Sequence, residues 1–206
     1  MSINRGWTKA GLALALALTP ISLGAQGLGP NASDGEAFLS AVKEGDANKA
    51  IELANQPGSR VASYRGYDGN TPLHIVTRKR ELDWVGFLLN KGADPNVGDD
   101  NGDTPLIIAA GIGFEEAAAF MLAKGAKVDA LNRRGETALA IAVRQRHPRM
   151  VELLLKAGAN PDKPDRVSGY TPRENAKRDT RNPQLLKLIE SVKPTAKKPV
   201  AGPVIN

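Results

Sequence analysis

Apolar side chains recur along this chain in short stripes that have the spacing of a helix face. Each stripe lies fourteen, seventeen and eighteen residues after a threonine, so its members share one side of a helix. Glycine follows the first three stripes and is expected to end those helices, because it enters the left-handed conformation without steric cost. The four stripes are Val85, Leu88 and Leu89; Ala118, Met121 and Leu122; Val151, Leu154 and Leu155; and Leu185, Leu188 and Ile189.

A further helix is predicted ahead of each stripe, because a helix-start signal precedes it. Threonine supplies a capping oxygen, and in three of the four cases a proline follows, which needs no amide partner at the first helical position. The threonines are 33, 33 and 34 residues apart, and the glycines that end the second helices keep the 33-residue step. Two landmark series with one period indicate a repeated helix–turn–helix unit. The motif residues are Thr71, Pro72, His74, Gly92, Thr104, Pro105, Gly125, Thr137, Gly158, Thr171 and Pro172.

The repeats predict a stack with distinct ends, because one such unit cannot bury its apolar stripe alone. Residues 34–66 form a degenerate helix pair without the threonine landmark and are expected to cap the N-terminal end. Full repeats are expected at residues 67–99, 100–132 and 133–165, and residues 166–191, whose first helix is polar, are expected to cap the other end. The predicted fold class is all-α, a solenoid of stacked helix–turn–helix units.

The repeat resembles the ankyrin-repeat family, and Thr71-Pro72-Leu73-His74 is the nearest match to the helix-opening motif of that family. The resemblance covers roughly residues 34–191 and implies an ankyrin-repeat solenoid with projecting loop or hairpin fingers. It also implies that the fingers and the first helices form a concave face that binds partner proteins.

Three departures from the family pattern bear on stability. The motif histidine survives only as His74, and Glu174 in the last unit is expected to complete a capping box with its threonine instead. The glycine between the two helices is kept as Gly113 but is replaced by Arg80 and Arg146 in the flanking repeats. If these arginines are left-handed, each costs about 1–2 kcal/mol relative to glycine.

A partner-binding surface is predicted at the ends of the first helices and at the fingertips. Arginine and tyrosine are enriched at the energetic centres of protein interfaces, although runs of charge on exposed helices are also ordinary solvated faces. The helix ends are basic at both ends of the array and apolar in the middle, so the expected partner is a protein with an acidic patch. The predicted surface comprises Tyr64, Arg65, Tyr67, Arg78, Lys79, Asp100, Asp103, Ile112, Arg133, Arg134, Arg144, Arg166, Tyr170 and Arg178.

No catalytic or cofactor-binding constellation is recognisable. The chain has two histidines, far apart, and no cysteine, so we expect no metal site and interpret His74 and His147 as structural. Gly111-Ile112-Gly113 lacks the third glycine or lysine of a phosphate loop, and the acidic cluster at residues 99–103 lacks the glutamate of a calcium loop and is expected to be a solvated fingertip. We therefore expect a non-catalytic binding module without cofactors, and an enzyme of unrecognised type remains the less favoured alternative.

The first 25 residues have the pattern of a secretory signal peptide. Arg5 and Lys9 precede an apolar run at residues 10–18, which Pro20 and a small-residue stretch follow. Cleavage near residues 24–27 would give a periplasmic or secreted protein, and a bacterial periplasm is the expected compartment; an uncleaved N-terminal anchor on an envelope scaffold is the alternative. We also expect a disordered basic tail at residues 192–206, a monomer, and no stable membrane insertion after cleavage. No nucleic-acid partner is expected, because loss of Arg5 and Lys9 lowers the net charge from +6 to about +4 and export removes the chain from nucleic acid.

Overall fold

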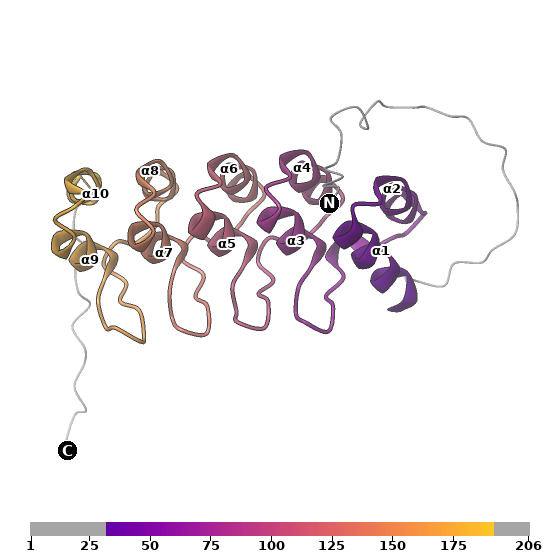
Figure 1. The fold of residues 1–206 in the computed structure, drawn as a ribbon, viewed down its shortest axis with the longest axis horizontal. Coiled ribbons are helices and arrows are strands. Elements are labelled where there is room, and N and C mark those ends of the chain that lie inside the picture. The colour runs from indigo at the N-terminus through magenta and orange to yellow at the C-terminus, as the bar shows by residue number, and fades with distance from the viewer. Residues whose placement is uncertain (1–31, 192–206) are drawn as a thin grey trace, which may run out of the picture. The chain divides into compact units, whose positions relative to one another are not determined.

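A computed structural model describes residues 32–191, which form ten α-helices and one short 3-10 helix without a strand (Figure 1). The predicted signal peptide and basic tail lie outside these residues. The chain divides into two compact units at Pro105 and Leu106, and each unit is considered by itself. Within each unit the helices occur as consecutive pairs, and long loops extend from the layer of the first helices, away from the second helices (Figure 1).

The first unit contains two helix pairs. Helices α1 (Ala32–Glu44) and α2 (Ala47–Asn55) form one, and α3 (Pro72–Arg78) and α4 (Leu82–Asn90) form the other, with the 3-10 helix η1 (Val61–Ser63) between them. Helix α1 packs on α2 and α3, and α3 packs on α4. The predicted stripe on α4 is confirmed, since Val85, Leu88 and Leu89 are buried. Phe38 and Val42 of α1 are also buried, so the degenerate first pair contributes to this core.

The second unit contains three helix pairs. They are α5 (Pro105–Ile112) with α6 (Glu115–Ala123), α7 (Ala138–Arg144) with α8 (Pro148–Lys156), and α9 (Pro172–Arg178) with α10 (Pro183–Glu190). The first residue of α5, Pro105, is the last residue of the first unit. Helices α6, α8 and α10 pack in that order, and α7 packs on α9. Met121, Leu154 and Ile189 are fully buried, so the stripes on these second helices also face the core.

The helix starts use the caps that the sequence predicts. Nδ1 of His74 accepts the Thr71 amide over 3.1 Å, and Nε2 of His74 donates to the Asp103 carbonyl over 2.9 Å. This ring is fully buried and joins the start of α3 to the next finger. At the start of α9, Thr171 and Glu174 form the expected capping box. The prediction of structural histidine at position 74 is thus supported by two defined hydrogen bonds.

Two turns between paired helices are strained. Arg80 and Arg146 have φ values of 59° and 58°, and Gly113 at the matching position has 61°. Both arginines are therefore left-handed. Only glycine adopts this backbone without steric cost, so the two arginine turns carry strain that the glycine turn lacks.

Candidate partner-binding surfaces

Four fingers share one backbone pattern at the repeat spacing. In the first unit the amides of Gly66 and Asp99 donate to the carbonyls of residues 70 and 103. In the second unit the amides of Asn132 and Asp165 donate to the carbonyls of residues 136 and 170. Each turn is completed by a glycine with a positive φ. The fingers are therefore short closed loops, which hold their tip side chains outward from the helices.

Of the fourteen predicted surface residues, seven lie in the first unit and seven in the second. The first seven are Tyr64, Arg65, Tyr67, Arg78, Lys79, Asp100 and Asp103, and the second seven are Ile112, Arg133, Arg134, Arg144, Arg166, Tyr170 and Arg178. The structure gives each set its own surroundings, and several members have internal partners that sequence reasoning did not find.

Arg78 and Lys79, at the end of α3, bind other parts of the first unit. The guanidinium of Arg78 donates to Asn70 Oδ1 over 2.5 Å and to Asp99 Oδ2 over 2.7 Å. Nζ of Lys79 donates to the carbonyls of Val42 and Lys43 over 3.1 and 2.7 Å, at the C-terminal end of α1. Both basic side chains thus stabilise the unit as well as facing solvent.

The expectation that the acidic cluster forms a solvated fingertip is wrong for Asp99. Only 3% of its side chain is exposed. Its Oδ1 accepts the amides of Asn101 and Asp103 over 2.8 and 3.0 Å, while Oδ2 accepts Arg78. Asp99 can be buried because its hydrogen bonds to the finger amides and to Arg78 offset the cost of removing its carboxylate from water.

At the fingertips of the first unit, paired and unpaired side chains alternate. Arg65 and Asp100 form an ion pair of 2.9 Å, and the Tyr64 hydroxyl donates to Glu36 over 3.2 Å. Burial and the nearby Glu36 carboxylate raise the pKa of Tyr64 above its ordinary value. Tyr67 is different, because 95% of it is exposed and no hydrogen bond holds its side chain within the described residues.

The second unit has its own buried carboxylate, Glu136, which sequence reasoning missed. It accepts Arg134 Nε over 2.7 Å, Asn132 Nδ2 over 3.0 Å and a further bond from Arg144. Burial raises the pKa of Glu136, but the hydrogen bonds from Asn132 and the two arginines outweigh it, so the net shift is downward. The repeat register held a signal for it. Asn132 occupies the position that Asp99 occupies one repeat earlier, so the carboxylate in this repeat comes from Glu136, four residues later.

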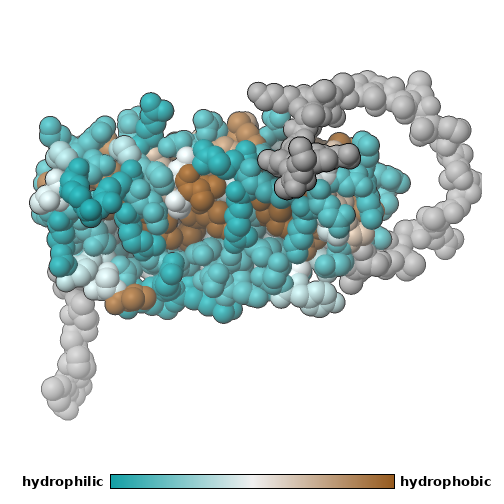
Figure 2. All heavy atoms as spheres, viewed as in Figure 1, coloured by the Kyte–Doolittle hydropathy of each residue, from teal (hydrophilic) through white to brown (hydrophobic). Residues whose placement is uncertain are grey.

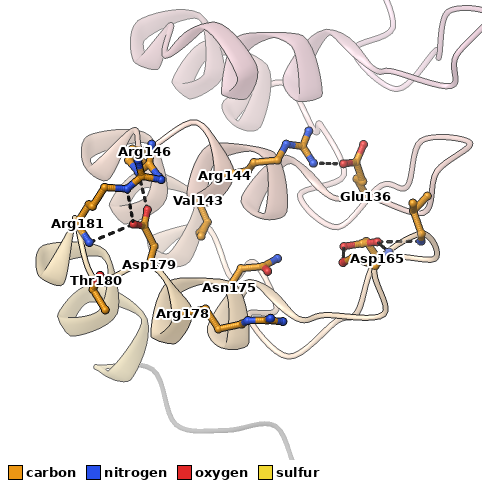
Figure 3. A pocket seen from close by; sticks show the side chains of 12 residues that line it. Glu136, Val143, Arg144, Arg146, Asp165, Asn175, Arg178, Asp179, Thr180 and Arg181 are labelled. Atoms are coloured by element: carbon orange, nitrogen blue, oxygen red, sulfur yellow. Dashed lines mark hydrogen bonds and ion pairs between the residues drawn. The ribbon is translucent and has the colours of Figure 1, made fainter.

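A groove of about 560 Å³ lies between the last fingers and the ends of α7 and α9 (Figure 3). Arg146 and Arg181 pair with Asp179 over 2.5 and 3.7 Å on one side of it, and Arg144 pairs with Glu136 on another (Figure 3). Arg178 also lines the groove, and its guanidinium carbon lies 4.1 Å from the centre of the Tyr170 ring.

The remaining surface residues of the second unit are exposed. Arg133 and Arg166 have no side-chain ion pair or hydrogen bond in the part of the chain that the structure describes. Ile112 is 37% exposed, Tyr170 40% and Val167 75%. Hydrophilic residues cover most of the face seen in Figure 2, and apolar residues show among them in patches. The fingertips of this unit therefore present both free cations and apolar groups.

Other chemistry is sparse between residues 32 and 191. No group of three or more histidine, cysteine or acidic side chains there could hold a metal ion. None of the helices in this range is long and apolar enough to cross a membrane. Gly113 forms the turn between α5 and α6, where Nε2 of His147 donates to the Gly111 carbonyl over 3.2 Å. Gly111 thus belongs to the last turn of α5 and Gly113 to the helix-to-helix turn after it.

Comparison with known proteins gives a family match and partial matches to relatives. A family model described as ankyrin repeats in three copies matches residues 81–165. A protein of Oryza sativa subsp. japonica named "Probable E3 ubiquitin-protein ligase XBOS33" is 45% identical over 71 residues, which are 34% of this chain and 13% of the relative. A Fowlpox virus (strain NVSL) protein named "Putative ankyrin repeat protein FPV240" is 40% identical over 57 residues, which are 28% of this chain and 14% of the relative. The chain thus matches only a small part of either relative.

Proposed function

Residues 81–165 place this chain in the ankyrin-repeat family, and from that premise we propose that it is a non-catalytic adaptor that binds another protein. Ankyrin repeats generally mediate protein–protein interaction. The binding residues in this proposal are the fingertips and the ends of the first helices. The proposal rests on the fingertip side chains that are exposed and form no hydrogen bond or ion pair within the described residues.

These side chains are Tyr67 in the first unit and Arg133 and Arg166 in the second. Tyrosine buries much area for little lost conformational freedom, and both tyrosine and arginine are enriched among the residues that dominate interface energetics. Arg78 and Arg144 are less suitable as primary contacts, because each already holds a buried carboxylate. The centre of each proposed binding surface therefore lies at the fingertips and not at the helix ends.

The place of action in this proposal is outside the cytoplasm, in a bacterial periplasm or secreted. The basic leader, the short apolar run and the absence of cysteine from the whole sequence support it. The alternative is an envelope scaffold that keeps residues 1–25 as an anchor. Sequencing the N-terminus of the protein from its native host separates the two: loss of about 25 residues supports export, and an intact Met1 contradicts it.

The binding proposal is tested by affinity capture with the full chain on extract of the same compartment. Arg133→Glu and Tyr67→Ser are compared with the unaltered chain, and Lys187→Glu on α10 is the matched charge-reversal control. The proposal expects one protein to be retained, lost with the tip variants and kept with the control. Equal retention by all four proteins would contradict it. Light scattering should give the mass of a monomer.

An enzyme is the second class of function, and it is tested on the same material. A hydrolase screen of the purified chain would overturn the adaptor proposal if turnover were found and disappeared with a single substitution. His74 is a poor base for such chemistry, because burial lowers its pKa to about 4 and both ring nitrogens are already bonded.

A further inference from the structure

The groove of the second unit differs from the rest of the surface in how its charges are balanced. Four arginines line it, at positions 144, 146, 178 and 181, with three carboxylates, Glu136, Asp165 and Asp179. Asp179 lies between Arg146 and Arg181, and Glu136 is bonded to Arg144. Asp165 is bonded to the hydroxyl and amide of Ser168. Among the described residues, Arg178 is the arginine of the four that pairs with no carboxylate.

Arg178 is positioned without a carboxylate. Its guanidinium stacks on Tyr170 at 4.1 Å, and no ion pair or hydrogen bond involves its side chain within residues 32–191. Stacking fixes a guanidinium by its face and leaves the N–H groups on its edge available. The edge of Arg178 is therefore a preorganised pair of donors for a planar acceptor such as a carboxylate.

Two uncharged polar side chains lie beside Arg178 in the groove. Asn175, one turn earlier on α9, and Thr180, in the turn after it, line the groove and have no side-chain hydrogen bond in the described part of the chain. Figure 3 shows Asn175 next to Arg178, and no dashed line reaches either side chain. An amide side chain can both donate to and accept from the backbone of an extended peptide. Val143 and Val167 add apolar lining.

On the basis of the proposed function, we propose that this groove binds an extended peptide segment of the partner that carries one carboxylate, which Arg178 receives while Asn175 bonds the peptide backbone. The balance of charges favours such a segment over nucleic acid. Three carboxylates offset three of the four arginines that line the groove, so its net charge is about +1, which suits one acidic side chain better than a chain of phosphates.

The test uses a random peptide library displayed on phage, panned against the immobilised full chain. The selected peptides should carry glutamate or aspartate at one position, several-fold enriched over the starting library. In a selected peptide, replacing that acid by its amide should raise Kd about tenfold, as expected for one charge-assisted hydrogen-bonded pair. Selection of neutral or basic peptides, or of none, would overturn the proposal.

Variants assign the acid preference to the groove. Arg178→Gln should abolish the enrichment of acids, and Asn175→Ala should weaken all selected peptides alike. Arg149→Gln, an exposed arginine on α8, is the matched control and should keep the enrichment. Circular dichroism confirms that each variant is folded. The same acids selected by the Arg178→Gln chain would contradict the assignment, as would tighter binding of a single-stranded oligonucleotide through Arg178.

The two proposals fail separately. If Arg178→Gln leaves capture of a protein unchanged while the fingertip variants lose it, the adaptor function stands and the groove is not its site. If no protein is captured from extract and the library yields no acidic peptide, both are contradicted.

Discussion

Nη2 of Arg78 lies 2.7 Å from Oδ2 of Asp99, a carboxylate with only 3% of its side chain exposed. Arg144 stands in the same relation to the buried Glu136 of the second unit. The basic helix ends are therefore partly internal structure, and reversing their charge would disturb the fold and the binding surface together.

Replacing Arg78 should cost stability. In Arg78→Gln the buried Asp99 loses its cation, and the free energy of unfolding is expected to fall by about 1–3 kcal/mol. Urea unfolding followed by circular dichroism measures this. Arg149→Gln, which removes an exposed arginine, should change the free energy by less than about 0.5 kcal/mol. Equal midpoints for the two variants would show that the pair with Asp99 contributes little.

The chain should lose stability in mild acid through His74. Desolvation lowers the pKa of this ring to about 4, whereas an exposed histidine titrates at 6.5. The unfolded chain therefore takes up a proton below pH about 6.5 while the folded chain does not, so stability is full above that pH and falls as the pH decreases. The expected loss is about 2 kcal/mol at pH 5 and about 3 kcal/mol near pH 4.

Comparison with His74→Leu isolates this effect. The variant should be less stable at neutral pH, because Thr71 and Asp103 lose a hydrogen-bond partner. Its stability should nevertheless change less between pH about 7 and 5, where the carboxylates are still ionised. A pH dependence identical to that of the unaltered chain would assign the acid sensitivity to other groups.

The turns between paired helices should respond oppositely to glycine and alanine. In Gly113→Ala the new Cβ would lie 2.9 Å from Nδ1 of His147 on a backbone with φ of 61°, so we expect a loss of about 2 kcal/mol. In Arg80→Gly, relief of strain should exceed the added freedom of the unfolded chain, and a gain of up to about 1 kcal/mol is expected. Thermal unfolding compares them; a destabilised Arg80→Gly chain would mean that the arginine side chain contributes more than its backbone costs.

The helices and their buried faces could be predicted from the sequence because they depend on local periodicity. Leu88, Leu154 and Ile189 are buried as their spacing indicates, and the capping box at Thr171 forms from two residues on one turn. These features follow from backbone geometry that repeats with the sequence. The same repeat register aligned Arg80 and Arg146 with the turn glycine, Gly113, and all three are left-handed.

The partners of the charged side chains could not be predicted in this way. Arg78 reaches a carboxylate 21 residues away, whereas Arg144 reaches one only 8 residues away, although the two arginines hold equivalent repeat positions. Which carboxylate a long side chain meets depends on the path of the finger and on rotamers, and neither has a sequence period. Arg178 was predicted as a surface residue, but its free edge could not be predicted, because it depends on which arginine pairs with which carboxylate.

Titration calorimetry of the captured protein against the full chain decides whether the exposed fingertips bind another protein. We expect Tyr67→Ser or Arg133→Glu to raise Kd about tenfold or more and Lys187→Glu to leave it unchanged. A Kd that is the same for all three variants would contradict the claim.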